Sequence, residues 1–521
     1  MNDINKIIKN KSLLLKLLIT IGSALFFINY IRCNIRPRYS SFHSGWWSYA
    51  DQGRYYREVI AWAHLDLAPS QHWYLPMYTL IGVPFWFVHK VDPFIIPDLI
   101  CFILSIVGVS RLSGKILPDL PYAAQIGALA CLVTWVISPA GLLSWVIPWT
   151  TTLATPLLIW LFLFADRLLE TMQPKWASRC GLLFGLLALT RPTEAMWTAL
   201  PVILYCLYGV FSSKQSTRVI INCVMVGIMT AMFIAAVGIF LHYICYGSSL
   251  GRYLDDSRQT GFELGSVLSQ WVLHVISPFP LHPDASLGMA FFFWWLLPGM
   301  VGIVLAVAGR RLPPISYVVC AAIVIHWIVY LSYRDLHPEG LWRYNNYHYF
   351  KWTQPFFFIF FINLIYVFIK SSKKTRVFIA LSSFMILLLL TMWRVDFVPL
   401  PAYEQTAYFR TAHEIDIPNG LTTYAQAIRV QAKGSFESIN DNHSVFIQAG
   451  QIRSFNHNVK AWPINGGFLL ESLRKLPSGP GRLLIGNDIT PIVGSVPQLG
   501  YIVPHFGLPC LHRDVGPYTV L

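Results

Sequence analysis

The chain has 521 residues, and Lys, Arg, Asp and Glu together make up only 12% of it. Soluble domains carry about 25% charged residues. Hydrophobic residues reach 55% and aromatic residues 15%, so the composition excludes a disordered chain, a coiled coil and an ordinary soluble enzyme, and it indicates a polytopic membrane protein. In such a protein the formal net charge of +14 is typical of basic residues that orient membrane segments rather than of nucleic-acid binding.

Eleven apolar runs approach the length of about 20 residues that a helix needs to cross a bilayer. They lie at 13–31, 94–110, 121–137, 150–166, 180–190, 195–211, 219–243, 289–307, 315–332, 355–369 and 377–393. The first run follows three lysines and has no small-residue cleavage site, so we interpret it as a retained anchor with a cytoplasmic N-terminus. Residues 76–90 are apolar but short and contain two prolines, which favours a helix in the outer interface or a re-entrant segment.

Lys and Arg residues are distributed as the positive-inside rule requires. The predicted cytoplasmic loops hold 13 Lys and Arg in 44 residues, whereas the predicted outer loops hold 10 in 122 residues. The inner loops are 111–120, 167–179, 212–218, 308–314 and 370–376, and the outer loops are 32–75, 138–149, 244–288 and 333–353. Eleven crossings place the C-terminus outside, and we expect a bacterial inner membrane with the C-terminus in the periplasm.

The composition changes near residue 394. Residues 1–393 are predicted to form the membrane domain, with 32–93 as its large first outer loop, and residues 394–521 are long enough for a small domain with its own core. In this tail the patterns predict strands at 444–448 and 481–486 and short helices at 402–414 and 467–476. The predicted fold is an all-α polytopic membrane protein with about eleven transmembrane helices and a small mixed α/β extracytoplasmic C-terminal domain.

The first outer loop contains an acid directly before a predicted amphipathic helix. One face of that helix, at i, i+4 spacing, carries Tyr55, Tyr56, Val59, Ile60 and Ala63. Asp51 opens the helix and is followed by Gln52 rather than by a second acid. The position suits a catalytic carboxylate and suits a helix N-cap equally well. Arg54, within the next turn, is a candidate for substrate binding.

An arginine lies at a predicted helix break within the membrane. The run 180–190 rises only about 16 Å, roughly half of a hydrocarbon core of about 30 Å, and Pro192 disfavours helix at Arg191. A charged side chain is tolerated there only inside protein or in a wet cavity. Arg191 therefore either faces an anionic group such as a phosphate or forms a local ion pair with Glu194 that holds a kink.

In the outer loop at 341–352, ionisable side chains alternate with six aromatic residues. Aromatic faces bind sugar rings well, and Arg and Lys bind phosphate well. Alternatively, the pattern is an aromatic belt at the membrane interface whose cations extend toward water. The candidate substrate-binding residues of this loop are Arg343, Tyr344, His348 and Lys351. Elsewhere no zinc spacing, Walker loop, dinucleotide fingerprint or nucleophile elbow is present, and His326 is interpreted as a core residue of a span.

Taken in order, these features resemble the type C (GT-C fold) membrane glycosyltransferase superfamily, which includes protein O-mannosyltransferases and bacterial transferases that move aminoarabinose onto lipid A. The resemblance covers about the first 400 residues. Its features are the anchor helix, the acid before an amphipathic helix at 51–56, the aromatic–proline stretch at 73–78, the glycine-containing run that ends at Arg191-Pro192, eleven spans and an outer C-terminal domain. The family often has two adjacent acids where this chain has Asp51-Gln52, which leaves metal use open.

The resemblance implies an inverting transfer of a sugar from a polyprenyl-phosphate donor to an acceptor hydroxyl at the outer membrane face. Asp51 takes the role of general base, and Arg191, Arg343 and Lys351 are candidates for stabilising the departing phosphate. No cofactor or metal ligand is assigned. The expected partners are the membrane lipid carrier and a glycan, lipid or protein acceptor, with no nucleic acid.

Two other classes stay open. A transporter or flippase of lipid or glycan also needs buried charges, but it predicts internal repeats, and the sequence shows none. A non-catalytic membrane assembly protein keeps the spans and the tail but has no need of Asp51 or Arg191.

Overall fold

The computed structural model describes residues 2–370, except for 34–49, 91, 248–250, 277–287, 310–311, 335, 337–340 and 342–345, together with ten strands between 393 and 506. The predicted span at 377–393, apart from its last residue, therefore lies outside the described residues. The same holds for the candidate site residues Arg343 and Tyr344.

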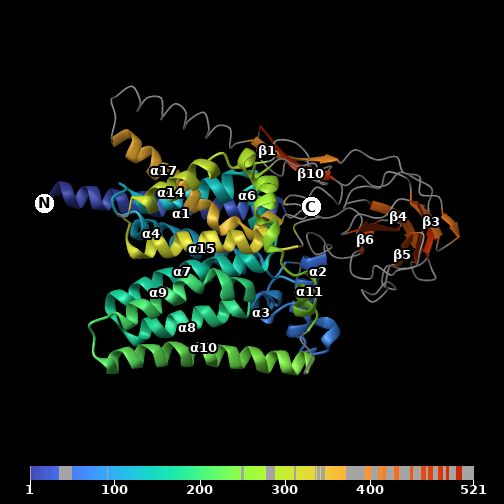
Figure 1. The fold of residues 1–521 in the computed structure, drawn as a ribbon, viewed down its shortest axis with the longest axis horizontal. Helices are drawn as coiled ribbons and strands as arrows, with labels where there is room; N and C mark the ends of the chain where they lie inside the picture. Colours follow the sequence, from blue (N-terminus) through green and yellow to red (C-terminus); the bar gives the residue numbers. More distant parts are fainter. Residues whose placement is uncertain are drawn as a thin grey trace.

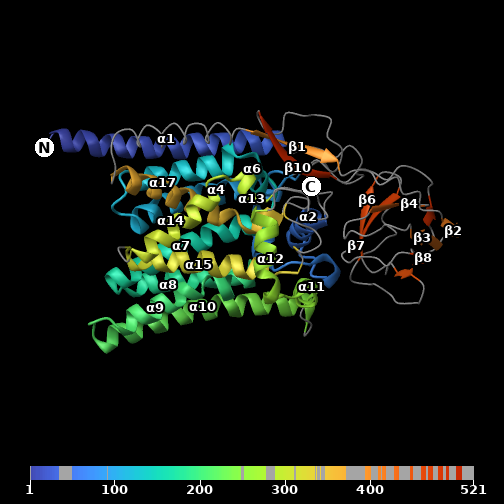
Figure 2. The ribbon, with the colours of Figure 1, turned by 45° about the horizontal axis from the view of Figure 1, so that its top comes forward.

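Long apolar helices lie side by side in one bundle (Figures 1 and 2). Its members are α1 Asn2–Cys33, α4 Ile95–Ile116, α5 Ala123–Leu132, α7 Thr150–Thr171, α8 Pro174–Ala188, α9 Leu200–Phe211, α10 Thr217–Tyr246, α14 Leu296–Ala308, α15 Pro314–Leu331 and α17 Gln354–Lys370. Small residues allow close packing: a Cβ on Gly181 of α8 would lie 2.2 Å from the carbonyl oxygen of Gly227 in α10. The backbones of these two helices are therefore in contact.

The first ten predicted runs coincide largely with helices, whereas Trp393, the one described residue of the eleventh, begins the strand β1 Trp393–Pro399. Within the described ranges, seven helices are long and apolar enough to cross a membrane, or eight if the bent pair 123–137 and 140–146 is one span. The helices α8 and α14 have only 15 and 13 residues, so the described part of the chain does not reach the expected eleven full-length spans. The protein is a predominantly helical, integral membrane protein with several spans.

Three short helices gather at the end of the bundle opposite the N-terminus (Figure 1). They are α2 Ala50–Ala63, α3 Pro76–Trp86 and α11 Arg252–Thr260. The helix α3 falls within the segment 76–90, where a short helix was expected. In the predicted apolar face of α2, Tyr55 and Val59 are buried against Tyr78 and Phe94, and the other three residues are partly buried. Burial of that face attaches α2 to the bundle end.

The remaining short helices connect these elements. They are α6 Pro139–Val146, α12 Val267–Trp271 and α13 Met289–Phe292, with single turns at Pro69–Gln71, Val133–Ile137, Glu194–Thr198, Leu264–Ser266, Val272–Ile276, Asn346–Tyr349 and Lys351–Thr353. Two of these turns, Glu194–Thr198 and Asn346–Tyr349, carry residues of the candidate site.

The described residues of the tail form β-strands only. The strand β1 Trp393–Pro399 pairs antiparallel with β10 Gly500–Phe506. The others form sheets of order β2-β3-β8-β5 and β6-β7-β4-β9. Their bounds are β2 Phe409–Thr411, β3 Glu414–Ile417, β4 Ala427–Ala432, β5 Phe446–Ala449, β6 Val459–Ile464, β7 Gly467–Ser472, β8 Gly479–Leu484 and β9 Ile489–Pro491.

The strands correct part of the prediction for the tail. The strands expected at 444–448 and 481–486 are confirmed by β5 and β8, whereas the helix expected at 467–476 is wrong over β7 and the helix expected at 402–414 is wrong over β2. The strand β7 pairs with β6 on one side and β4 on the other. Ladder hydrogen bonds on both edges outweigh a weak helical pattern, because propensity is easily overridden by tertiary context.

Candidate active site

The predicted helix break at Arg191 is present. The helix α8 ends at Ala188, and helical structure resumes only after Arg191. The Arg191 side chain is 7% exposed, and the carboxylate of Glu194, in the turn that follows, is 4% exposed. A guanidinium this deeply buried needs acceptors and a counter-charge from the protein.

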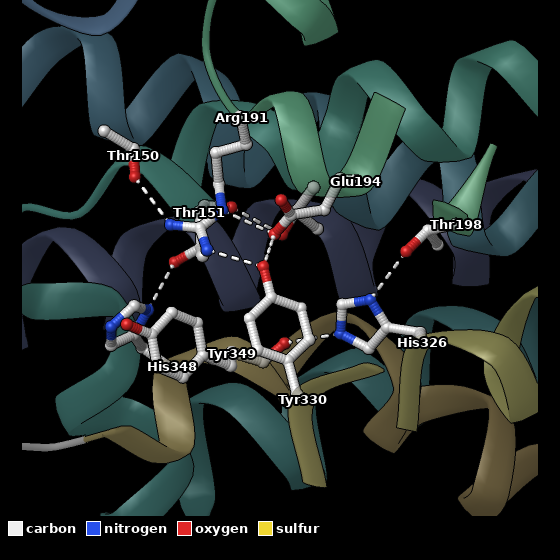
Figure 3. A network of polar contacts seen from close by, with 10 residues as sticks. Thr150, Thr151, Arg191, Glu194, Thr198, His326, Tyr330, His348 and Tyr349 are labelled. Carbon is white, nitrogen blue, oxygen red and sulfur yellow. Dashed lines mark hydrogen bonds and ion pairs between the residues drawn. The ribbon is translucent and has the colours of Figure 1, made fainter. Parts of the chain in front are cut away.

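Arg191 joins three helical segments through its hydrogen bonds (Figure 3). Nε donates to Glu194 Oε1 (2.5 Å), Nη1 to Thr150 Oγ1 at the start of α7 (3.0 Å), and Nη2 to the Tyr330 hydroxyl of α15 (2.5 Å). The Tyr330 hydroxyl in turn donates to Glu194 Oε1 (2.7 Å). The ion pair with Glu194 exists, but it is one part of a network. These contacts use three of the five N–H groups that a guanidinium carries.

Aromatic rings and a histidine complete this network. The Arg191 guanidinium lies 5.1 Å from the centroid of the Tyr349 ring, a cation–π distance. His348 is stacked on Trp149 (3.9 Å between ring centroids), and its Nδ1 is hydrogen-bonded to Thr151 Oγ1 (3.0 Å). Burial, together with the charges of Arg191 and Lys351, lowers the pKa of His348 well below its ordinary value. His348 is therefore a neutral polar group here rather than a cation.

His326 has the core role that the sequence predicted. Its Nε2 donates to the carbonyl oxygen of Tyr349 (2.8 Å), and its Nδ1 is hydrogen-bonded to Thr198 Oγ1 (2.9 Å). Figure 3 shows that the imidazole ties α15 to the turn after Arg191 and to the 346–349 turn. Both ring nitrogens are satisfied, so the side chain holds the network in place.

Lys351 is fully buried among protein acceptors. Its Nζ donates to the carbonyl oxygen of Ser144 (2.9 Å) and to Thr152 Oγ1 (2.8 Å), and it lies 4.4 Å from the centroid of the Trp145 ring. Its own carbonyl accepts from the Trp135 indole (2.8 Å). In this structure Lys351 ties its loop to α6 and α7; its predicted contact with a phosphate stays a prediction.

Replacing Lys351 with Met should therefore lower stability more than donor affinity. The change leaves the Ser144 carbonyl and the Thr152 hydroxyl without their donor, and each buried group left unpaired costs about 1–3 kcal/mol. We expect a lower melting temperature in detergent, whereas Lys370→Met, at the exposed end of α17, should not change it. An unchanged melting temperature together with a raised KM for a lipid-phosphate donor would instead favour the phosphate contact.

Asp51 lies within the first turn of α2 rather than before it, because the helix begins at Ala50. Its Oδ1 accepts a hydrogen bond from the Tyr74 hydroxyl (2.5 Å) and lies 3.9 Å from Nη1 of Arg54. The Asp51 side chain is 39% exposed, so this carboxylate is accessible from solvent. The Arg54 guanidinium stacks on the Trp73 ring at 3.7 Å. Both predicted residues of this helix thus contact the segment 72–75 that precedes α3.

Three tyrosines pack together beside Asp51, and we call Tyr55, Tyr74 and Tyr253 the tyrosine cluster. The ring of Tyr74 lies 4.5 Å from that of Tyr55 and 5.1 Å from that of Tyr253, centroid to centroid. Burial raises the pKa of all three phenols, and Tyr253 interacts electrostatically with both Arg191 and Asp51. The cluster therefore stays protonated, and two of its members, Tyr55 and Tyr253, interact electrostatically with both the predicted acid and the predicted cation.

A second acid of α2, Glu58, is buried beside this site. Its Oε1 accepts the backbone N–H groups of Trp73 (2.5 Å) and Tyr74 (2.6 Å), and the residue is 1% exposed. Burial raises the pKa of Glu58 to about 8, against lowering contributions from these two N–H groups. The acid is therefore neutral in the folded protein at neutral pH.

This raised pKa predicts a dependence of stability on pH. Between the ordinary pKa of about 4.3 and the folded value of about 8, the folded state holds a proton that the unfolded state has lost. Stability should therefore fall as pH rises through this interval, by at most about 1.4 kcal/mol per unit. Melting temperatures of wild type and Glu58→Gln from pH 5 to 9 should converge at the acid end and diverge at the alkaline end. Parallel curves would contradict the raised pKa.

Several residues of the site carried no signal that the sequence analysis used. They are Glu58, Tyr74, Thr150, Tyr253, Tyr330 and Tyr349. Glu58 could have been found, because it lies seven residues after Asp51 and so on the same helix face. Thr150 and Tyr330 come from distant helices, and no local pattern marks them. Within the described ranges, no three His, Cys, Asp or Glu side chains are grouped so that they could hold a metal ion.

No protein-family model and no curated protein matches the sequence. Among solved structures, the chain is similar to ArnT from Cupriavidus metallidurans bound to undecaprenyl phosphate (10% identity, TM-score 0.48) and in the apo state (11%, 0.48), each match covering 71% of this chain and 62% of that chain. It is also similar to arabinosyltransferase EmbB from Mycobacterium smegmatis (11%, TM-score 0.34; 95% of this chain and 64% of that chain). The chain thus spans less than two thirds of the length of each.

Proposed function

We propose that the protein is an inverting membrane glycosyltransferase that uses a polyprenyl-phosphate sugar as donor. One observation carries the proposal: a partly exposed carboxylate, Asp51, and a buried guanidinium, Arg191, both interact electrostatically with tyrosines of the same cluster. A displacement at a sugar carbon needs a base on the incoming hydroxyl and a cation near the departing phosphate. The donor class follows from the resemblance in sequence features.

In this mechanism the acceptor oxygen forms a bond to the anomeric carbon while the bond from that carbon to the phosphate oxygen breaks. The electron pair of the broken bond stays on the phosphate, and the proton of the acceptor hydroxyl goes to Asp51. Arg191 keeps two N–H groups beyond those bonded to described residues. Because the Arg191 side chain is buried, its charge acts on the phosphate with less screening than in water.

The test is a transfer assay. Purified protein is incubated with radiolabelled polyprenyl-phosphate sugars and a membrane extract, and label is followed from the lipid carrier into the extract. Label transfer that depends on the protein supports the proposal. If label only crosses the membrane while still attached to its carrier, the protein is a flippase. If no label moves with any donor, the assembly role is favoured.

We further propose that the site faces the periplasm and that residues 394–521 recognise the acceptor there. The short helices α2, α3 and α11 lie at the bundle end opposite the N-terminus, and the strands lie beyond the same end (Figure 1). The distribution of Lys and Arg along the sequence supports an outer location for that end.

A reporter that is active only in the periplasm, fused after Leu521, tests this orientation. We expect it to be active, because the basic loops hold the opposite end of the bundle in the cytoplasm. The same reporter fused within the 212–218 loop, where five residues connect α9 to α10 on the N-terminal side, serves as the inactive control. A silent C-terminal reporter on a normally inserted protein would contradict the orientation.

A further inference from the structure

One face of α2 contacts the irregular segment 72–75, which precedes α3. Asp51, Arg54, Tyr55 and Glu58 follow one another at helical i, i+3, i+4 and i+7 spacing and so lie on one face. Each contacts the segment differently: Asp51 through the Tyr74 hydroxyl, Arg54 through the Trp73 ring, Tyr55 through the Tyr74 ring, and Glu58 through two backbone N–H groups. The first three contacts involve side chains, whereas Glu58 holds the backbone.

The Glu58 contact is well suited to fixing a backbone. Residues 72–75 precede α3 and belong to no strand, so no ladder pairs the N–H groups of Trp73 and Tyr74. Buried N–H groups require an acceptor, and Glu58 Oε1 accepts both at 2.5 and 2.6 Å. Two successive N–H groups that converge on one oxygen define the orientation of the peptide between them, and therefore the direction in which the Tyr74 side chain leaves the backbone.

That direction determines the contact with Asp51. The Tyr74 hydroxyl donates to Asp51 Oδ1 at 2.5 Å, and its ring packs between Tyr55 and Tyr253. A carboxylate bonded through one oxygen has a defined rotamer and keeps its second oxygen for another proton. We propose that Glu58 is a positioning residue, which holds Tyr74 against Asp51 and so orients the carboxylate for the acceptor hydroxyl. This inference rests on the proposed function.

Glu58 does not itself meet substrate in this arrangement. The residue is 1% exposed, whereas the Asp51 side chain is 39% exposed. Glu58 Oε1 accepts its two hydrogen bonds as a carboxyl oxygen, and the amide oxygen of a Gln side chain would accept them in the same way. Thr79, which lies beside the carboxyl, donates its own hydrogen to the Pro76 carbonyl (3.0 Å), so its oxygen is available to a Gln N–H. Gln should therefore replace Glu58, whereas Leu should not.

The experiment is a double-mutant cycle on the rate of label transfer. The proteins are wild type, Glu58→Gln, Glu58→Leu, Tyr74→Phe and the double variant Glu58→Leu/Tyr74→Phe. We expect Glu58→Gln to stay within about threefold of wild type, because it retains both hydrogen bonds. Glu58→Leu should lose on the order of 10²-fold in kcat, the scale of an ångström of misplacement. In the Tyr74→Phe background the same Leu change should cost far less, because contacts that act in series are not additive.

Two controls separate positioning from loss of folding. Glu263→Leu removes an exposed acid that pairs with Arg334 at 3.6 Å, and it should leave kcat unchanged. If Glu58→Leu does not fold, Glu58→Asp replaces it in the cycle, since it keeps the carboxyl but shortens its reach by one methylene.

The outcomes are distinct. Equal losses from the Glu58 change in both backgrounds, a silent Tyr74→Phe, or a Glu58→Gln as poor as Glu58→Leu would each overturn the positioning role and leave the proposed function standing. A wild-type protein that transfers no sugar at all would overturn both together.

Discussion

Replacing Asp51 with Asn should lower sugar transfer by about 10²–10⁴-fold, the usual loss when a general base is removed. The Asn side chain keeps the size and an oxygen that can accept the Tyr74 hydroxyl, which lies 2.5 Å from Asp51 Oδ1, but it cannot take a proton. The quantity to measure is the initial rate of label transfer at saturating donor, together with the melting temperature. The loss should appear in kcat with little change in stability, because the side chain is 39% exposed.

Asp66→Asn is the matched control for this change. Asp66 lies on the same outer loop and accepts the backbone N–H of Ala68 at 3.1 Å, a contact that Asn also makes, so transfer should be unaffected. If Asp51→Asn transfers sugar at the wild-type rate, Asp51 is not the general base, and its place at the start of α2 is a structural one.

Removing the Arg191 cation should lower kcat/KM for the lipid-phosphate donor by about 10²–10³-fold, the range for losing one donor to a developing negative charge. Arg191→Ala alone also leaves the buried Glu194 carboxylate without its partner, at a cost of about 3–5 kcal/mol in stability. The combined variant Arg191→Met/Glu194→Gln removes both charges, so the folded protein remains measurable. The rate is then attributable to the missing cation.

Glu194→Gln alone supplies the comparison. It keeps an oxygen that can accept from Arg191 Nε and from the Tyr330 hydroxyl, so kcat/KM should fall by less than about tenfold. Equal losses for Glu194→Gln and for the combined variant would mean that the ion pair maintains the kink and that Arg191 has no separate part in donor use.

Much of the local structure could be read from the chain. Apolar residues at i, i+4 spacing predicted the helix α2 and its apolar face, and Tyr55 and Val59 of that face are buried. The short apolar run and Pro192 predicted the break at Arg191. These predictions succeeded because spacing along one helix and the steric demand of proline are local properties. In the tail, β7 was mistaken for a helix because its ladder partners lie in other segments.

The sequence by itself determined that this chain is a helical membrane protein, where most of its helices lie, and that Asp51 and Arg191 are unusual in their surroundings. Composition, hydropathy and proline carry that information within single segments. Only the tertiary structure decided what these side chains meet. Arg191 reaches Thr150 and Tyr330, which are 41 and 139 residues away, Tyr74 reaches Asp51 across 23 residues, and Lys351 is enclosed by α6 and α7. Such contacts depend on how helices pack against each other, because a buried charge must find its partners wherever the fold brings acceptors together.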